Sequence, residues 1–296
     1  MMRDLRAYIT FFAALLTIAF VLNACAQSAP SLRREEAERI AMPVFMYDRT
    51  IRTDQLNVRA WERVRDNNKP VHVYIGSAGT VAFINQKSRF SPDDPTPDDP
   101  VALRMAAQDS HANVIYLARP CQYKNNADQR SCILNYLGGG SFTRSVIDSY
   151  MKVLDNIKAY HDVEEFDLIG YAGGGGIATI LAAKRYDVYS LRTVAGILDT
   201  QALSDTNKDI TRYRGANPAD MAGKLVNMPQ HHFVGQQDSH IQPAIFHSFA
   251  QTMGKRHCMN YTLLDKAGHT IGWVERWKQL LNAPLGCNRL GEVIPQ

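Results

Sequence analysis

The sequence has little net charge, no internal repeat and no cysteine spacing typical of a metal site. Its 33 Lys and Arg residues nearly balance 29 Asp and Glu residues, giving a formal charge of +4 with no basic cluster, so we expect no nucleic-acid partner. Without a CxxC pair or Cys/His ligand spacing we expect no metal site, and no motif implies a cofactor. The 296 residues, 45% hydrophobic and 21% charged, have an ordinary globular composition.

The first 24 residues have the organisation of a signal peptide. Arg3 and Arg6 supply a positive beginning, and residues 7–22 form a nearly continuous hydrophobic run that is short for a membrane span. The following Leu22-Asn-Ala-Cys25 resembles the lipobox of bacterial lipoproteins, in which cleavage precedes a cysteine that then receives a diacylglycerol. This resemblance implies an exported bacterial lipoprotein that faces the periplasm, with a lipid on Cys25 as its membrane anchor.

Ala26 follows this cysteine, and under the same resemblance it favours the outer membrane over the inner one. The alternative is an ordinary signal peptide cut near Ala24 or Ala26, which predicts an unlipidated periplasmic protein. After residues 1–24 we expect a tether and short helix over 25–41 and a single domain over 42–296.

The remaining four cysteines are Cys121, Cys132, Cys258 and Cys287. An even number of cysteines in an exported chain predicts disulfides, and four cysteines allow three pairings. Loop length favours Cys121–Cys132, which would close a polar loop, and Cys258–Cys287, which would fix the C-terminus.

A strand, a glycine-rich turn and a helix are predicted in succession between residues 166 and 184. A short apolar run predicts a buried strand, and four glycines then begin a segment rich in Ala, Ile and Leu that predicts a helix. This is the layout of the nucleophile elbow, G-x-S-x-G, whose strained turn presents a serine hydroxyl above a sheet. Gly170 and Gly174 occupy its glycine positions, but Ala172 stands where the serine belongs.

These residues resemble the α/β-hydrolase superfamily, over a span from about Val71 to Leu281. More narrowly, the chain resembles bacterial members that carry Arg-Pro-Cys-Gln-Tyr, present here at 119–123, and whose elbow reads Gly-Tyr-Ser-Gly-Gly-Gly. The resemblance implies a fold derived from serine hydrolases of ester or acyl substrates, with nucleophile, acid and histidine in that order. Only the nucleophile departs from the pattern at the elbow.

Strands alternate with helices along the rest of the chain, which predicts a mostly parallel, doubly wound α/β sheet with helices on both faces. The expected strands are 43–47, 56–64, 70–75, 113–117, 166–169, 191–198, 230–235 and 261–264, the first two forming an antiparallel edge. The expected helices are 101–108, 142–160, 173–184, 243–253 and 271–281.

Active groups of such a sheet lie on loops after the carboxyl ends of its strands. Asp238 follows the strand at 230–235, in a turn that resembles the acid loop of the superfamily. His269 follows the last strand, where the resemblance places the general base, which Asp238 would orient. Asp199, one strand earlier, is the rival acid.

The oxyanion hole of the superfamily uses the N–H after the nucleophile, here Gly173, and a second N–H from the loop after the strand at 70–75, here represented by Ser77. Ser77, Ser239 and Tyr171 are the other hydroxyls near the expected site. Ordinary turn roles account for the two serines, and a phenol with a pKa of about 10 is a poor nucleophile.

We expect impaired hydrolysis and a pocket retained for binding a small ester or acyl ligand. Losing a triad nucleophile costs about 10⁶ in kcat, or about 8 kcal/mol of barrier, although His269 could still activate water slowly. The alternative is an active hydrolase with a displaced nucleophile, or one whose serine was artificially changed to alanine. A purely structural lipoprotein is a third hypothesis, and it predicts a filled pocket.

Overall fold

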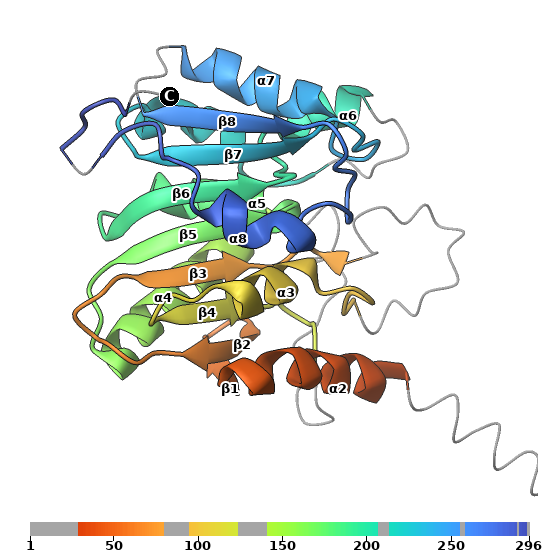
Figure 1. Cartoon of the computed structure of the whole chain (residues 1–296), viewed down its shortest axis with the longest axis vertical. Helices are drawn as coiled ribbons and strands as arrows, with labels where there is room; N and C mark the ends of the chain where they lie inside the picture. The colour runs from red at the N-terminus through yellow and green to blue at the C-terminus, as the bar shows by residue number, and fades with distance from the viewer. Residues whose placement is uncertain are drawn as a thin grey trace, which may run out of the picture.

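The computed structural model describes residues 29–79, 95–123, 141–206, 213–254, 258–288 and 290–294. An eight-stranded sheet runs in the order β1-β2-β4-β3-β5-β6-β7-β8 (Figure 1). β2 pairs antiparallel with both β1 and β4, and all the other neighbours pair in parallel. The strands are β1 (Tyr47–Arg52), β2 (Asn57–Arg63), β3 (Val71–Ile75), β4 (Val114–Leu117), β5 (Phe166–Tyr171), β6 (Val188–Val194), β7 (Gln230–Gly235) and β8 (Met259–Leu264).

Helices cover both faces of this sheet (Figure 1). They are α2 (Ala29–Ala41), α3 (Val101–Gln108), α4 (Arg144–His161), α5 (Gly173–Ala182), α6 (Thr200–Thr206), α7 (Pro243–Met253) and α8 (Trp277–Leu281), with 3-10 turns η1 (Met42–Val44), η6 (Pro218–Leu225) and η7 (Val274–Arg276). One core packs α4, α5 and α7 on one face, and a second packs α2, α3 and α8 on the other. The central strands β5 and β7 are buried throughout, as expected of strands covered by helices on both faces. The predicted doubly wound α/β sheet is confirmed.

The N-terminal edge departs from the predicted strand at 43–47, which is wrong. Met42–Val44 is a 3-10 turn, Phe45 adopts a left-handed conformation with φ 62°, and the strand begins only at Tyr47. Pro43 lacks the N–H that a strand ladder needs, which favours the turn. The predicted strand at 56–64 is present as β2, and it forms the expected antiparallel edge with β1.

Two predicted boundaries also shift. β6 begins earlier than the expected 191 and ends at Val194, because Ala195 takes a positive φ of 47° and turns the chain toward the elbow. Only the end of the expected helix 271–281 is helical, because Gly272 has φ 87°. The sequence analysis missed α6 and η6, which are short and lie between β6 and β7.

The disulfide between Cys258 and Cys287 is present, as predicted. Cys121 is also disulfide-bonded, and its predicted partner Cys132 lies outside the described residues. So do the predicted signal peptide and Cys25. Among the helices that the structure describes, none combines the length and hydrophobicity needed to cross a membrane.

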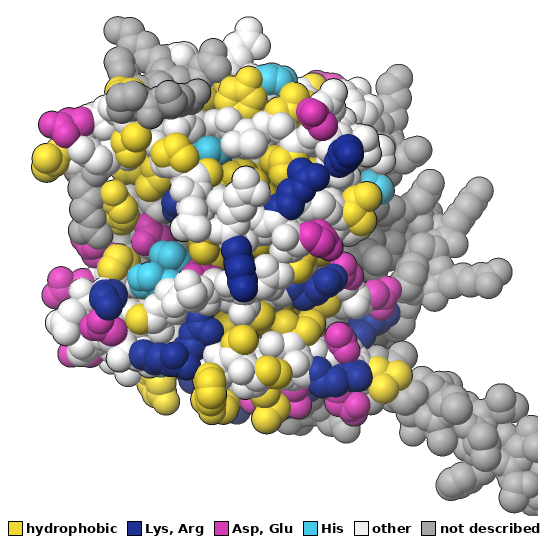
Figure 2. All heavy atoms as spheres, in the orientation of Figure 1, with side chains coloured by type: hydrophobic (Ala, Val, Ile, Leu, Met, Phe, Trp, Pro, Cys, Tyr) yellow, Lys and Arg dark blue, Asp and Glu magenta, His cyan; other side chains and the backbone are white. Residues whose placement is uncertain are grey.

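Large apolar side chains are exposed along the edge formed by α2, η1 and β1. Figure 2 shows hydrophobic side chains along this edge, interspersed with Lys and Arg. Leu32, Met42, Phe45 and Tyr47 are each more than half exposed. The opposite side of α2 packs into the second core through Ala37 and Ala41, so this helix is part of the folded unit.

Candidate functional site

The elbow lies between β5 and α5, at the carboxyl end of the central strands. Ala172 joins the two elements with φ 51° and ψ −118°, a conformation that residues other than glycine rarely adopt. Its N–H donates to the carbonyl oxygen of Val194 at 2.9 Å, and its own carbonyl accepts from the N–H of Ile197 at 3.0 Å. A Cβ atom on Gly170 would lie 2.4 Å from the oxygen of Gly174, so the turn requires glycine there. The strained elbow is kept although the serine is absent.

The structure brings Asp238 and His269 together. Asp238 is buried, and its Oδ2 lies 3.0 Å from Nδ1 of His269. Its Oδ1 accepts from the N–H groups of His240 and Ile241, both at 2.8 Å. The Tyr171 hydroxyl donates to the backbone oxygen of His269 at 2.8 Å and holds the loop in place. A carboxylate fixed in this way can orient an imidazole and stabilise its protonated form.

Asp199, the rival acid, is occupied elsewhere. Its Oδ2 accepts from the Ser248 hydroxyl at 2.6 Å, and its Oδ1 accepts from the N–H groups of Gln201 and Ala202 at the start of α6. Burial raises the pKa of Asp199, but these hydrogen bonds outweigh burial and the net shift is downward. These partners give Asp199 the role of a helix cap.

A cavity of about 320 Å³ lies in front of the elbow. Its walls include Ala172 and Gly173 of the elbow, Ser77 and Ala78 of the loop after β3, and His269. Because this cavity is open, the filled pocket expected of a purely structural protein is not found. The elbow, the acid–histidine pair and the cavity therefore share one site.

A larger hollow of about 620 Å³ lies at the N-terminal edge, among Phe45, Glu62, Tyr160 and His161. It contains neither the elbow nor the acid–histidine pair. Its size reflects an open surface between β1, β2 and the end of α4. We therefore place the candidate site at the smaller cavity, which is lined by the elbow and by the histidine of the acid–histidine pair.

The oxyanion loop approaches the elbow through Ala78. The Ala78 nitrogen lies 4.0 Å from the position that a Cβ atom would occupy on Gly173. Ser77 lines the cavity as well, but its Oγ accepts from the N–H of Gly79 at 3.3 Å and its carbonyl accepts from the Gln122 side chain. The sequence analysis chose Ser77 from this loop, whereas the amide of Ala78 is the one closest to Gly173.

The three hydroxyls named in the sequence analysis are unsuited to nucleophilic attack. Burial raises the pKa of Tyr171, the Asp238 carboxylate raises it further, and its proton is engaged by the backbone of His269. Ser77 sits in a local turn, and the exposed Ser239 does not line the cavity. An activated nucleophile needs a base within hydrogen-bond reach, and no described contact supplies one to either serine.

Asp238, His240 and His269 could together hold a metal ion. One ligand atom from each residue lies within 4.8 Å of the others. Burial lowers the pKa of His240, and the neighbouring His269 lowers it further. The Asp238 oxygens already accept three hydrogen bonds, so a cation would compete with the orientation of His269. The absence of a metal stays a prediction.

The segment 119–123 builds the wall behind the elbow. The backbone N–H of Arg119 donates to Oε1 of Gln122. The Nε2 of the same Gln122 side chain donates to the carbonyl oxygens of Ser77 and Pro95. The Arg119 guanidinium is buried, and its Nη1 lies 3.2 Å from the Cβ position of Gly173. The sequence analysis noted this segment as a mark of resemblance but assigned no role to its residues.

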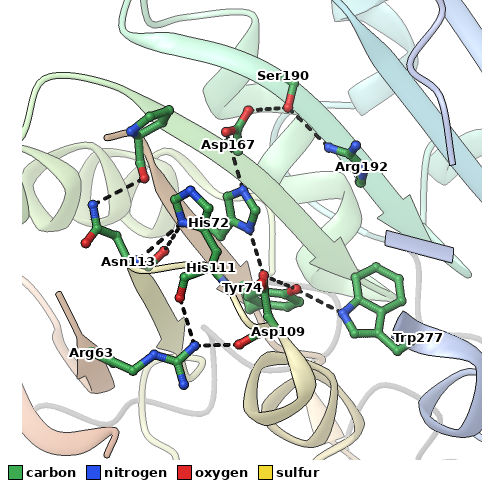
Figure 3. Close-up of polar contacts among 11 residues, drawn as sticks. Arg63, His72, Tyr74, Asp109, His111, Asn113, Asp167, Ser190, Arg192 and Trp277 are labelled. Carbon is green, nitrogen blue, oxygen red and sulfur yellow. Dashed lines mark hydrogen bonds and ion pairs between the residues drawn. The ribbon is translucent and has the colours of Figure 1, made fainter. Parts of the chain in front are cut away.

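A second polar cluster lies at the amino ends of β3 and β5, away from the elbow (Figure 3). Asp109, which follows α3, lies 2.7 Å from Nδ1 of His72 and accepts from the Tyr74 hydroxyl at 2.8 Å. Trp277 of α8 donates to Tyr74, and His72 also faces Asp167 at 3.6 Å. Burial raises the pKa of Asp109, but His72, the N–H of His111 and the Tyr74 hydroxyl together outweigh burial and the net shift is downward. The contacts of this cluster fasten α3 and α8 to the sheet.

No protein-family model and no curated protein matches the chain. Among solved structures, a membrane phospholipase A, a novel bacterial virulence factor, aligns with a TM-score of 0.53 and 14% identity over 92% of this chain and 99% of that one. Est1E from Butyrivibrio proteoclasticus aligns with a TM-score of 0.54 and 12% identity, over 79% and 97% of the two chains. An alpha-beta serine hydrolase homologue from Coxiella burnetii aligns with a TM-score of 0.55 and 12% identity, over 79% and 94%.

The architecture is that of a serine-hydrolase-like α/β protein. The chain has the fold of the α/β-hydrolase superfamily, as its elbow sequence predicted. Identities of 12–14% establish the fold, and the chemistry has to be argued from the site itself.

Proposed function

We propose that this chain is an exported α/β-hydrolase-fold protein that binds a small ester or acyl ligand in the elbow cavity and hydrolyses it poorly. The observation that carries the proposal is Ala172 in the strained elbow conformation, beside a cavity that it shares with His269. A serine here would give its proton to the histidine and attack an acyl carbon. A methyl group has neither the proton nor the lone pair, and the loss corresponds to about 10⁶ in kcat.

Slow hydrolysis by water is the second candidate function. The contact between Asp238 and His269 supports it, because that pair can orient the imidazole as a general base for a water molecule in the cavity. This mechanism predicts a rate that depends on His269 and leaves no covalent intermediate.

Restoring the serine tests the proposal. We expect Ala172→Ser to hydrolyse p-nitrophenyl butyrate at least about 10³-fold faster than the unchanged protein, and to label with a fluorophosphonate probe. The double variant Ala172→Ser with His269→Asn is the matched control, because it keeps the hydroxyl but removes its base. It is expected to lose both turnover and labelling.

Turnover and labelling of the unchanged protein at the level of the serine variant would show a displaced nucleophile and contradict the proposed impairment. If the unchanged protein turns over the ester without fluorophosphonate labelling, and the single variant His269→Asn loses this turnover, the water mechanism would be supported. A folded but silent Ala172→Ser variant would show that the oxyanion donors are not competent, and ligand binding alone would then be tested by calorimetry.

We further propose that the protein is lipidated on Cys25 and held at a membrane, with the outer membrane favoured by Ala26. The lipobox-like sequence supports this proposal, and so do the exposed apolar side chains on α2, η1 and β1 (Figure 2). Only three residues separate Cys25 from Ala29, where α2 begins, so a lipid would keep this edge near the bilayer.

Replacing the acceptor cysteine tests the anchor. We expect Cys25→Ser to move the protein from the membrane to the soluble fraction and to abolish labelling by a radioactive fatty acid, because the thiol carries the lipid. A Ser28→Ala variant, changed in the same segment, should keep both properties. Membrane association unchanged by Cys25→Ser would contradict lipid anchoring.

A further inference from the structure

The guanidinium of Arg119 is a buried cation without an anionic partner among the described residues. It follows β4, and only 1% of the residue is exposed. Nη2 donates to the carbonyl oxygen of Ser141 at 3.2 Å, whereas Nε and Nη1 have no hydrogen-bond partner within the part of the chain that the structure describes. Burial lowers the pKa of Arg119, and the hydroxyls of Tyr150, Tyr213 and Tyr116 act in the opposite direction. A buried charge of this kind is costly unless an anion compensates it.

Arg119 does not itself line the elbow cavity, but its unpaired Nη1 lies close to Gly173, which does. Nη1 is 3.2 Å from the Cβ position of Gly173, and the Ala78 nitrogen is 4.0 Å from that same position. Gly173 and Ala78 both line the cavity. Both nitrogens thus lie within 4.0 Å of one point beside Gly173, so the cation is close to the two segments that carry the candidate oxyanion amides, and its positive field adds to theirs.

The acidic side chains around the cavity are already neutralised. Asp98 pairs with Arg33 at 2.7 Å, and Asp99 pairs with Arg104 at 3.1 Å. Asp238 is held by His269 and two backbone amides. Among the described residues, the uncompensated charge next to the cavity is thus the positive charge of Arg119, which favours an anionic group in a ligand.

Without a serine nucleophile at position 172, an oxyanion could form here only through the slow attack of water, so it would compensate this charge rarely and briefly. The carboxylate of a free acid carries the same negative oxygen and requires no attack. We propose that the elbow cavity binds free carboxylic acids in preference to their esters, with the carboxylate at the amides of Gly173 and Ala78 and with Arg119 as its counter-charge. The inference rests on the proposed binding function and names the class of ligand.

Paired ligands of equal chain length test this preference in the unchanged, purified protein. Hexanoate and methyl hexanoate, titrated by calorimetry at pH 7.5, differ mainly in the charge of the head group. One charge at a few ångströms from Arg119 predicts roughly 10- to 100-fold tighter binding of hexanoate. Hexylamine, with the opposite charge, is expected to bind more weakly than the ester.

The variant Arg119→Met keeps most of the side-chain volume without the charge. It should reduce hexanoate affinity to that of the ester and leave methyl hexanoate unchanged, whereas Arg119→Lys should retain part of the preference. Thermal unfolding of each variant shows whether it is folded, and the acid-to-ester ratio of the unchanged protein decides the question if Arg119→Met does not fold.

Equal or tighter binding of methyl hexanoate to the unchanged protein would overturn this inference and leave the binding function standing. A preference for hexanoate that survives in folded Arg119→Met would overturn the role of Arg119. Binding of neither compound would overturn the inference together with the proposed function.

Discussion

A Cβ atom on Gly174 would lie 2.1 Å from the carbonyl oxygen of Ile75, a contact with backbone that cannot rotate away. Ala172, two residues earlier, holds a positive φ that costs roughly 1–3 kcal/mol. The close approach of β3 therefore requires glycine at position 174, and Ala172 carries backbone strain. Its geometry does not depend on the residue that would perform the chemistry.

We expect Gly174→Ala to lower the free energy of unfolding by more than about 3 kcal/mol, because the new methyl must displace β3. Gly223→Ala is the matched control, since nothing lies within 4 Å of its Cβ position. Its effect should stay within about 1 kcal/mol. Urea denaturation measures both variants, and equal midpoints would contradict this account of the turn.

At the scale of elements, His232 joins β7 to its neighbours. Its Nδ1 accepts from the Thr193 hydroxyl of β6 at 2.7 Å, and its Nε2 donates to Gln230 Oε1 at 2.9 Å. The ring packs against Phe246 and Phe249 of α7. Burial lowers the pKa of His232 to about 3, and His231 contributes to the shift, so the side chain is neutral in the folded protein.

The depressed pKa predicts acid sensitivity. The unfolded chain takes up a proton at His232 below about pH 6.5, and the folded protein does so only near pH 3, so stability falls as the pH decreases through this interval. The full contribution is on the order of 5 kcal/mol. His232→Gln, which keeps a donor and an acceptor but does not titrate, should flatten the decrease between pH 6.5 and 4 in urea denaturation. An unchanged pH dependence of the unfolding free energy in His232→Gln would contradict the assignment of this decrease to His232.

At the scale of the whole molecule, the C-terminal segment is fastened to the amino ends of β7 and β8. The N–H of Gly286 donates to the Gln230 carbonyl, and the Asn260 side chain donates to the carbonyl oxygens of Pro284 and Leu285. The Cys258–Cys287 disulfide closes this region over a sequence separation of 29 residues. These contacts secure the edge of the sheet that carries the His269 loop.

Cys287→Ser is expected to lower the free energy of unfolding by about 3–4 kcal/mol, the chain entropy associated with a loop of that length. Reduction with dithiothreitol should destabilise the unchanged protein at least as much, because Cys121 is also disulfide-bonded. Differential scanning calorimetry with and without the reductant measures the effect. A melting temperature that is unchanged in Cys287→Ser would show that the hydrogen bonds of residues 284–286 hold the C-terminal segment in place without the disulfide.

Local sequence patterns predicted most strands of the sheet but not the residues at which some elements end. The apolar runs at 70–75 and 113–117 became β3 and β4, because strands buried on both faces leave a continuous signal. The segment 230–235 became β7 although it begins Gln-His-His, and the side chains of these three residues are hydrogen-bonded in the core. Ala195 and Gly272 ended their elements early through positive φ values, which a pattern of hydrophobic residues does not encode. The proximity of Asp238 to His269 was anticipated from loop order, whereas the unpaired cation of Arg119 was not.

By itself, the sequence determined the α/β-hydrolase fold, the glycine frame of the elbow and the presence of alanine at position 172, because each of these is encoded in neighbouring residues. The sequence favoured Asp238 but left Asp199 as a rival, and only the tertiary structure showed that Asp199 is bound elsewhere. It also decided that Ala78 and the buried Arg119 both lie close to Gly173. These are contacts between loops from different strands, and their distances depend on how the sheet twists and packs, which no local spacing records.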